Sequence, residues 1–502
     1  MSDFLEGTTM MNGSDFLSSK VSCKHKMRLV LSAFWVFAFS GCAVGPDFKS
    51  PEAPQTTQYT QTSLPSETAS SNIPLGEAQR FVDGDLVQES WWHFFGSDAL
   101  NQLIEEALKS SPTLASASAN VRQAQELLAA YAGSSDYPQA ELLLGAQRQK
   151  TSPSTQGLSG ESRQYTLYTT GANVHYNLDF FGGNKRALES LAARVDYRRF
   201  EYEATRLNLI ANITTAAITR ARLFEQEEAL NATVLLQEKQ LEITRDRIRF
   251  GQASQDDMLS LQAQVEQARS EAIMLRKQRG EIEHLLAMLS GHTPSEVQIH
   301  AFRLSDFTLP TDLPLVVPSQ LVRQRPDIQA SEALLHVANA DYGVAISKLY
   351  PQINLSANLS AQALSTGTLF NANSTVWNVI GQITQPLFNP GLPAEKRAAL
   401  AAFDAAAANY KSVVVKAFRN VADTLNAIEN DAQNLRALTI ANNAAQTSLK
   451  SVQRQYDLGS ASYLQLLVAE QQARQIEIGT IAAQAQRLMD SVLLYQAIGG
   501  GF

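Results

Sequence analysis

The sequence predicts a mainly α-helical fold of long antiparallel hairpins, combined with four β-strands of the membrane type, in two structural repeats. Three observations predict it. Helix-forming residues continue for much longer than an ordinary globular helix needs. Four segments alternate between apolar and polar residues, as strands do. The same order of elements occurs twice along the 502 residues.

The amino terminus has the composition of an export signal. Basic residues at 24, 26 and 28 precede an apolar run from Leu29 to Phe39, and Ser40-Gly41-Cys42 follows. A basic segment, about ten apolar residues and small residues before the cleavage site are typical of such signals. No apolar run reaches the ~18 residues that a membrane-spanning helix needs.

Phe39-Ser40-Gly41-Cys42 resembles the bacterial lipobox, in which the cysteine is lipidated and becomes the first residue. We therefore expect residues 1–41 to be removed as a signal peptide and Cys42 to carry the lipid. The alternative is a plain signal peptide with an incidental cysteine. Met27 is a second possible start. Residues 42–90 are rich in Pro, Ser, Thr and Gln, and we expect an extended, lipid-anchored segment there.

The first repeat, residues 91–300, begins at Trp91-Trp92. Asp98 is a good N-cap for a helix that ends near Leu108, and Pro112 starts another that ends near Ala132. Two strand-like pieces follow. A helix of 67 residues is then expected from Asn184 to Phe250, about 100 Å long at ~1.5 Å per residue. Gly251 interrupts it, and a second helical run must return antiparallel.

The second repeat, residues 301–502, has the same order of elements. Pro326 opens a helix to about Lys348, and Tyr350-Pro351-Gln352 matches Tyr137-Pro138-Gln139. After two more strands and a turn over 389–393, a second long rod begins. Gly459 interrupts this rod as Gly251 interrupts the first. A period of about 210 residues with one element order indicates a structural duplication.

The strand-like segments have one apolar and one polar face over about ten residues, the length and alternation of transmembrane barrel strands. A half-exposed soluble sheet has the same pattern. Four strands cannot close a barrel, and open edges are not tolerated in lipid, so we expect a ring of copies to share one barrel. Three copies would supply twelve strands. The apolar positions are Ala172, Val174, Tyr176, Leu178 and Phe180 in one segment, and Ile353, Leu355, Ala357, Leu359 and Ala361 in another.

The helices carry apolar seams with spacings of three and four, which predicts side-by-side packing. Arg279 is the one interruption. One seam consists of Met258, Leu261, Val265, Ala268, Ala272, Leu275, Ile282, Leu286 and Leu289, and the other of Phe418, Val421, Leu425, Ile428, Ala432 and Leu435.

Residues of the kind that enzymes use form no recognisable pattern. The seven histidines are scattered, and no nucleophile elbow or phosphate-binding loop occurs. We therefore expect no enzymatic activity, no metal site and no cofactor other than lipid on Cys42. The net charge of −8 argues against a nucleic-acid partner.

Several motifs together resemble the lipoproteins of the TolC-like outer-membrane efflux family, the OprM/NodT group, over the whole mature chain. They are Cys42-Ala43-Val44-Gly45-Pro46-Asp47-Phe48, Trp91-Trp92, Leu100-Asn101-Gln102-Leu103-Ile104, Val322-Arg323-Gln324-Arg325-Pro326-Asp327-Ile328, Tyr350-Pro351 and Leu494-Tyr495-Gln496-Ala497-Ile498-Gly499-Gly500-Gly501.

The resemblance implies a homotrimer with a twelve-stranded barrel in the outer membrane and a helical tunnel across the periplasm. It also implies a periplasmic adaptor protein and an inner-membrane pump, usually of the resistance-nodulation-division type. The adaptor would dock at the hairpin tips, around Gly251 and Gly459.

The resemblance also locates a gate at the tips. Leu464 falls where OprM-like proteins have a closing apolar ring, and Val468 falls where they have an acidic one. We therefore expect an apolar gate that closes by dewetting. Tyr456, Asp256 and Asp257 are candidates for polar ties between hairpins; solvated tip residues are the alternative.

The predicted function is a passive exit duct for small molecules, driven by the partner pump. Type I protein secretion and metal-ion efflux are the alternatives within transport. A periplasmic tether or adhesin is the alternative of another class, and the duplicated strand pairs argue against it.

Overall fold

The computed structural model describes residues 43–56, 58–61, 65–83, 88–157 and 159–501. The predicted signal peptide, the alternative start at Met27 and the lipidation site Cys42 lie outside the described residues. The chain divides into two compact units. Among the described residues, the strand unit consists of 43–48 and of those within Ala130–Ser190 and Asn339–Ala401, and the helical unit of those within Lys49–Ala129, Leu191–Ala338 and 402–501.

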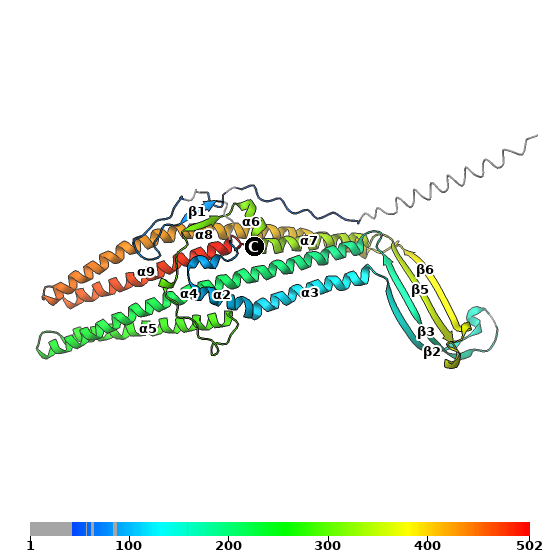
Figure 1. The fold of residues 1–502 in the computed structure, drawn as a ribbon, viewed down its shortest axis with the longest axis horizontal. Helices are drawn as coiled ribbons and strands as arrows, with labels where there is room; N and C mark the ends of the chain where they lie inside the picture. Colours follow the sequence, from blue (N-terminus) through cyan, green and yellow to red (C-terminus); the bar gives the residue numbers. More distant parts are fainter. Residues whose placement is uncertain (1–42, 57, 62–64, 84–87, 158, 502) are drawn as a thin grey trace, which may run out of the picture. The chain divides into compact units, whose positions relative to one another are not determined.

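The strand unit contains one antiparallel sheet of four strands (Figure 1). Its strands are β2 (Gln139–Thr151), β3 (Arg163–Leu178), β5 (Gln352–Ala363) and β6 (Thr375–Thr384). The order is β2-β3-β5-β6, so the central pair joins one strand from each repeat. Within the described chain, β2 and β6 are edge strands with one side unpaired.

The register places most of the apolar residues of the four strands on one face, because directly paired residues point to the same side of a sheet. Leu142 pairs with Ala172, Ala172 with Leu359, and Leu359 with Trp377. The predicted alternation is therefore confirmed for β3 and β5. Four of the most exposed members of this face are Leu142 at 89%, Leu144 at 83%, Val379 at 72% and Trp377 at 71%.

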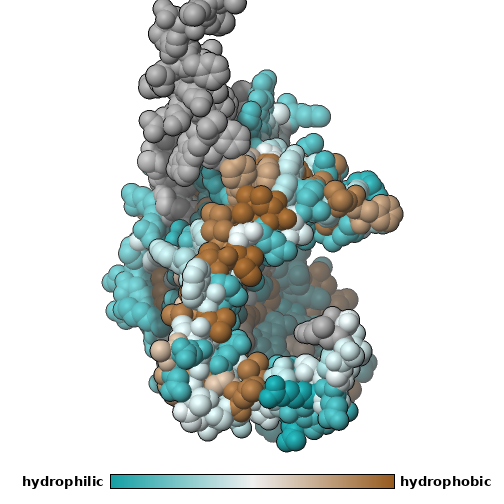
Figure 2. Space-filling view, turned by 90° about the vertical axis from the view of Figure 1, so that its right-hand side faces the viewer, coloured by the Kyte–Doolittle hydropathy of each residue, from teal (hydrophilic) through white to brown (hydrophobic). Residues whose placement is uncertain are grey.

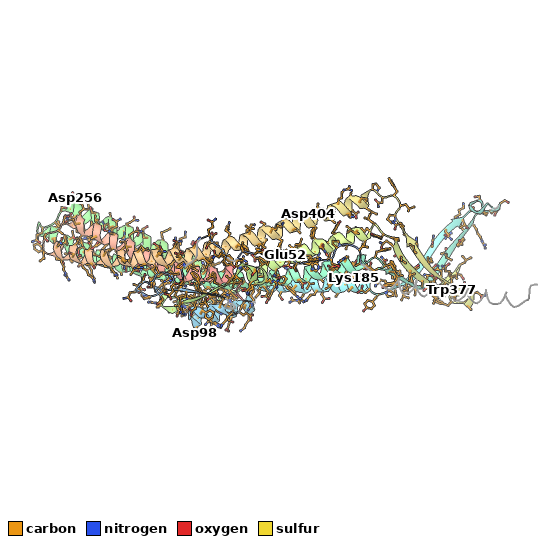
Figure 3. The ribbon with its side chains drawn as sticks, turned by 90° about the horizontal axis from the view of Figure 1, so that it is seen from above. Glu52, Asp98, Lys185, Asp256, Trp377 and Asp404 are labelled. Carbon is orange, nitrogen blue, oxygen red and sulfur yellow. The ribbon has the colours of Figure 1, made fainter. Side chains whose placement is uncertain are left out.

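The opposite face of the sheet is mixed: polar residues share it with Leu143, Val376 and Ile380. One row across the four strands consists of Glu141, Asn173, Asn358 and Asn378. The strands are longer than predicted on average, at 10 to 16 residues. Phe180, predicted as the last apolar residue of its strand, lies outside β3, which ends at Leu178. In Figure 2 apolar side chains gather in patches among polar ones, and Figure 3 labels Trp377 on its strand.

The long helices repeat with equal lengths. α4 (Gly183–Arg249) and α8 (Gly391–Asp457) have 67 residues each, and α5 (Gln255–Leu289) and α9 (Tyr463–Ala497) have 35 each. The two rods predicted from the sequence are confirmed. α8 starts at Gly391, inside the turn predicted over 389–393. Pro393 is tolerated there because it lies in the first turn of the helix, where a backbone N–H has no partner within the helix.

The shorter helices are α2 (Asp98–Ser110), α3 (Pro112–Ser135), α6 (Pro318–Gln324) and α7 (Pro326–Ser347). Asp98 is wrong as the N-cap of α2: the Ser97 side chain accepts from the Leu100 N–H, and Asp98 is the first helical residue. A small parallel pair, β1 (Arg80–Asp83) and β4 (Asp312–Leu315), connects distant parts of the helical unit. No helix among the residues described here is long and apolar enough to cross a bilayer.

The predicted helical seams are confirmed by burial. Leu261, Val265 and Ala268 of α5 are at most 2% exposed, as are Val421 and Leu425 of α8. The core of the helical unit also contains the tryptophans of the 3₁₀ helix η1 (Trp91–Phe95). Trp91 is fully buried and stacks on Tyr495, with ring centroids 5.2 Å apart.

Arg279, the interruption of the first seam, has a partner on the neighbouring helix. Its Nε donates to Glu227 of α4 at 3.0 Å, and Arg276 Nε donates to the same carboxylate at 2.8 Å. Burial raises the pKa of Glu227, but these two guanidinium groups outweigh it and hold the pKa below its usual value. A charged residue therefore interrupts the apolar seam without leaving a carboxylate unpaired.

A buried polar cluster fastens the extended amino-terminal segment to α9. Arg487, 2% exposed, donates to the Leu75 carbonyl at 2.9 Å and to the Gln79 side chain at 3.0 Å. Gln79 in turn donates to Ser491 at 2.9 Å. Asp490, 1% exposed, lies in the same turn of α9. Burial, with the neighbouring Asp431 carboxyl, raises the pKa of Asp490 to about 7 despite a hydrogen bond from Gln486.

The raised pKa makes Asp490 a source of pH-dependent stability. Between about pH 4 and pH 7 the folded chain keeps a proton that the unfolded chain releases, so stability falls as pH rises, by at most about 1.4 kcal/mol per pH unit. The Asp490→Asn substitution removes the titrating carboxyl and with it this pH-dependent contribution to stability. We expect thermal unfolding of the variant in detergent to depend less on pH between 5 and 7.

Asp404→Asn is the control, because Asp404 is exposed on α8 (Figure 3). Its unfolding profile should match that of the unmodified protein. An Asp490→Asn profile with an unchanged slope would show that the group is ionised in the folded protein at pH 5.

Candidate functional site

The two hairpin tips are built alike. Gly251 and Gly459 end the long helices in the left-handed region, with φ of 71° and 77°. The Gln252 N–H donates to the Arg247 carbonyl at 2.8 Å, and the Gly251 N–H donates to the Ile248 carbonyl at 2.9 Å. The second tip has the same pair of bonds, which is the Schellman arrangement at helix ends.

Each return helix starts with a capping box. Ser254 accepts from the Asp257 N–H, while the Asp257 carboxylate accepts from the Ser254 N–H. Ser462 and Gln465 make the same reciprocal pair at the start of α9. Both turns are therefore fixed by backbone hydrogen bonds at the end of the long helix and by side-chain caps at the start of the return helix.

An apolar cluster joins the two tips. Leu241 and Leu261 of the first hairpin pack with Tyr463 and Leu467 of the second, and all four are at most 8% exposed. Met258 and Tyr456 pack against this cluster. The tip of one hairpin is thus held against the other inside a single chain, mainly by side-chain burial.

The three predicted polar ties have different surroundings. Tyr456 lies between the hairpins: the Arg247 guanidinium of α4 lies 4.9 Å from its ring centroid, and the Tyr463 ring lies 5.8 Å away. Asp257 is used by the capping box of its own helix. Asp256 is exposed at the start of α5 (Figure 3). The structure thus places Tyr456 at the contact between the hairpins of one chain. The carboxyl of Asp257 lies near enough to Tyr463 of the second hairpin to contribute to its raised pKa.

Leu464 and Val468 lie on the surface of α9. Their exposed fractions are 69% and 57%, whereas their neighbours Tyr463 and Leu467 are buried in the tip cluster. A spacing of four residues puts both on one side of the helix. Phe250 and Leu458, in the turns, are 79% and 83% exposed. The tips thus present apolar side chains that the single chain does not cover.

Sequence reasoning missed a stripe of titratable groups along α9. Tyr463, Glu470 and Glu477 are seven residues apart, so they share one side of the helix. Burial raises the pKa of all three, most strongly that of Tyr463. At Glu470 a hydrogen bond from Gln237 of α4 opposes the rise. The heptad spacing was the signal that could have found them.

The profile of the Outer membrane efflux protein family matches residues 103–292 and 317–500. The chain belongs to this family. The family match covers both repeats, and it makes the protein an outer-membrane channel of an efflux system rather than an enzyme.

Individual members of the family are similar over nearly the whole chain. The probable efflux pump outer membrane protein TtgC of Pseudomonas putida is 28% identical over 494 residues, covering 94% of this chain and 96% of TtgC. The cation efflux system protein CusC of Escherichia coli O6:H1 is 27% identical over 470 residues, covering 93% and 97%. The solved outer-membrane channel OprN superposes with a TM-score of 0.82 at 25% identity, covering 92% and 99%.

Gly459→Ala is expected to weaken the second tip by about 1 kcal/mol, because a left-handed conformation strains any residue with a Cβ. A Cβ at Gly459 meets no atom within 4 Å, so conformation alone decides the result. Hydrogen exchange in peptides around the tip measures the effect.

Gly280→Ala is the matched control for the tip substitution. Gly280 lies inside α5, a Cβ there is also free of contacts, and its φ is ordinary, so we expect stabilisation of about 0.5–1 kcal/mol. Equal effects of the two substitutions would contradict the role given to the left-handed turn.

Tyr463→Phe tests the buried hydroxyl of the tip cluster. Among the described residues, no group hydrogen-bonds to this hydroxyl, so its removal should leave the stability unchanged or raise it by up to about 1 kcal/mol. Thermal unfolding of the purified protein measures this. A loss of more than 1 kcal/mol would show that the hydroxyl has a partner in the assembled protein.

Proposed function

We propose that three copies of this chain close their sheets into one twelve-stranded barrel and form a passive exit duct for small molecules. The observation that carries the proposal is the four-stranded sheet itself. One face is largely apolar and exposed, and the edges β2 and β6 have no partner among the residues that the structure describes. In lipid each unpaired backbone group costs several kcal/mol, so β2 of one copy pairs with β6 of the next.

The duct takes its energy from partners. A periplasmic adaptor protein and an inner-membrane pump, of the resistance-nodulation-division type, deliver the substrate, and the adaptor docks at the tips around Gly251 and Gly459. The exposed Phe250 and Leu458 support this role, since apolar side chains at a turn favour a protein contact. Lipid on Cys42 anchors residues 42–90, while residues 91–300 and 301–502 are the two repeats.

Small organic compounds are the first candidate substrates, by the similarity to TtgC, an efflux pump protein. Cation export is the second, because the similarity to CusC, a cation efflux protein, is nearly as high. Expression in cells that lack their own exit channel distinguishes the two. Restored tolerance to organic toxicants supports the first, and restored tolerance to toxic metal-cation salts alone supports the second.

The assembly has a direct test in detergent. Native mass measurement of the purified protein should give three chains per particle. Liposomes that contain the particle should swell in small solutes once the tips are loosened, whereas a tether would give no flux. A monomer in all detergents, with no flux, would contradict the proposal.

Leu464 and Val468 form the closed gate in this proposal, since an apolar constriction excludes water and therefore ions. We expect Leu464→Ser combined with Val468→Ser to raise the resting conductance of single channels at least several-fold. Recordings in planar bilayers measure it.

Ile440→Ser is the control for the gate. Ile440 is 64% exposed on α8, close to the exposure of Leu464, and it lies outside the tip cluster. Its conductance should stay at the resting level. Unchanged resting conductance in the Leu464→Ser/Val468→Ser variant would contradict a gating role for both residues.

A further inference from the structure

Residues 43–48, the first that the structure describes, are held by hydrogen bonds from Arg186 and Asn339 and to Phe181, which together we call the clamp. Arg186, in the first turn of α4, has a side chain only 4% exposed. Its Nε donates to the Val44 carbonyl at 3.2 Å, and one terminal nitrogen donates to the Gly45 carbonyl at 3.2 Å and to Asp47 Oδ1 at 2.8 Å. The other terminal nitrogen donates to Glu189 at 2.7 Å. One guanidinium thus binds the carbonyls of Val44 and Gly45 and the carboxylate of Asp47.

Two further hydrogen bonds hold the backbone of Val44 and Pro46. The Val44 N–H donates to the Phe181 carbonyl at 3.0 Å, three residues after the end of β3. Asn339 of α7, 4% exposed, donates from Nδ2 to the Pro46 carbonyl at 3.0 Å. The segment is therefore bonded to residues next to a strand and to two helices of the strand unit.

Glycines make room for this segment. A Cβ on Gly182 would lie 2.5 Å from Ala43, and a Cβ on Gly45 would lie 2.9 Å from the Gly343 Cα. A Cβ on Gly343 would lie 2.9 Å from the Arg186 side chain. Larger residues at these positions would displace the segment or the arginine, so the groove has the shape of the chain that occupies it.

The clamp begins one residue after the proposed lipidation site. Cys42 precedes Ala43 in the sequence, and consecutive Cα atoms are about 3.8 Å apart. If residues 43–48 were free, the lipid could move over roughly 20 Å at ~3.4 Å per residue. That reach is a large part of the ~30 Å hydrocarbon thickness of a bilayer. The bonds of Arg186 remove this freedom.

We infer that Arg186 is a positioning residue for the lipid anchor: it fixes the mature amino terminus beside the end of β3, so that the acyl chains enter the bilayer next to the sheet. The inference rests on the proposed lipidation of Cys42. Arginine suits the role because its planar fork serves several acceptors at once, which a lysine ammonium on a flexible stem does less well.

Hydrogen exchange of the full, lipidated chain in lipid nanodiscs tests the clamp. The backbone amides of residues 44, 45, 47 and 48 should exchange slowly in the unmodified protein, the Val44 amide most of all because it donates to the Phe181 carbonyl. Arg186→Gln should speed their exchange at least tenfold while the strand amides stay protected, and Arg186→Lys should have an intermediate effect. Arg199→Gln, which removes an exposed arginine of the same helix, should change nothing. Unchanged exchange in Arg186→Gln would overturn the inference.

Asp47→Asn keeps the test valid if Arg186→Gln fails to fold, since the Asp47 side chain is 90% exposed and carries no core packing. It should speed exchange of the same amides by a smaller factor, about threefold. No change in this variant together with an unfolded Arg186→Gln would assign Arg186 to general stability and overturn the positioning role.

The link to lipid is tested by making Arg186→Gln in two backgrounds. One is the lipidated protein, and the other carries Cys42→Ala and is exported by an ordinary cleavable signal peptide. The readout is the fraction of chain that resists urea extraction from outer membranes. If Arg186 acts through the anchor, its substitution lowers this fraction in the lipidated protein and has no further effect without lipid. Equal losses in both backgrounds would overturn the inference.

The same samples separate this inference from the proposal on which it rests. Mass measurement of the amino-terminal peptide should show acyl groups on Cys42. An unacylated peptide would refute the lipid anchor, and with it the positioning role, even where the exchange data show an intact clamp.

Discussion

Backbone hydrogen bonding in lipid is the constraint on which the rest of this structure depends. A strand that enters a bilayer must pair on both sides, because no water is available to its N–H and C=O groups. The sheet pairs β3 with β2 and β5 internally, and no other described segment pairs with the outer sides of β2 and β6. The proposed shared barrel would meet this requirement, because β2 of one copy would pair with β6 of the next.

The duplication makes such an assembly geometrically simple. Equal helix lengths in the two repeats bring Gly251 and Gly459 to corresponding positions, and the tip cluster around Leu261 and Tyr463 packs the two hairpins together there. Had one rod been a few turns longer, one tip would project past the other and this cluster could not form. Each turn of helix adds about 5.4 Å, which exceeds the reach of an apolar side-chain contact.

The sequence predicts the periodic parts of the fold well, because period and residue type are local properties. The rods, the seams and the alternation in β3 and β5 agree with the structure. The errors are at element ends: Ser97 rather than Asp98 caps α2, and Phe180 lies beyond β3, since caps depend on the local chain path. Contacts between residues far apart in sequence, such as Arg186 with Asp47 or Arg487 with Gln79, give no periodic signal. At the tips, Leu464 and Val468 stay a prediction that the family resemblance made, and the heptad stripe of Glu470 was not predicted.

The two apolar surfaces of this chain differ in a way that assigns them different surroundings. On the sheet, the register gathers most of the apolar residues of four neighbouring strands on one face. A largely apolar face of this kind suits lipid, which accepts any shape. At the tips the exposed apolar side chains, such as Phe250, Leu458 and Leu464, stand among polar residues on structured turns. Separate apolar contacts at fixed positions suit a surface of complementary shape, because each side chain needs its own pocket. These differences support the proposed roles, in which the sheet contacts the bilayer and the tips contact partner proteins.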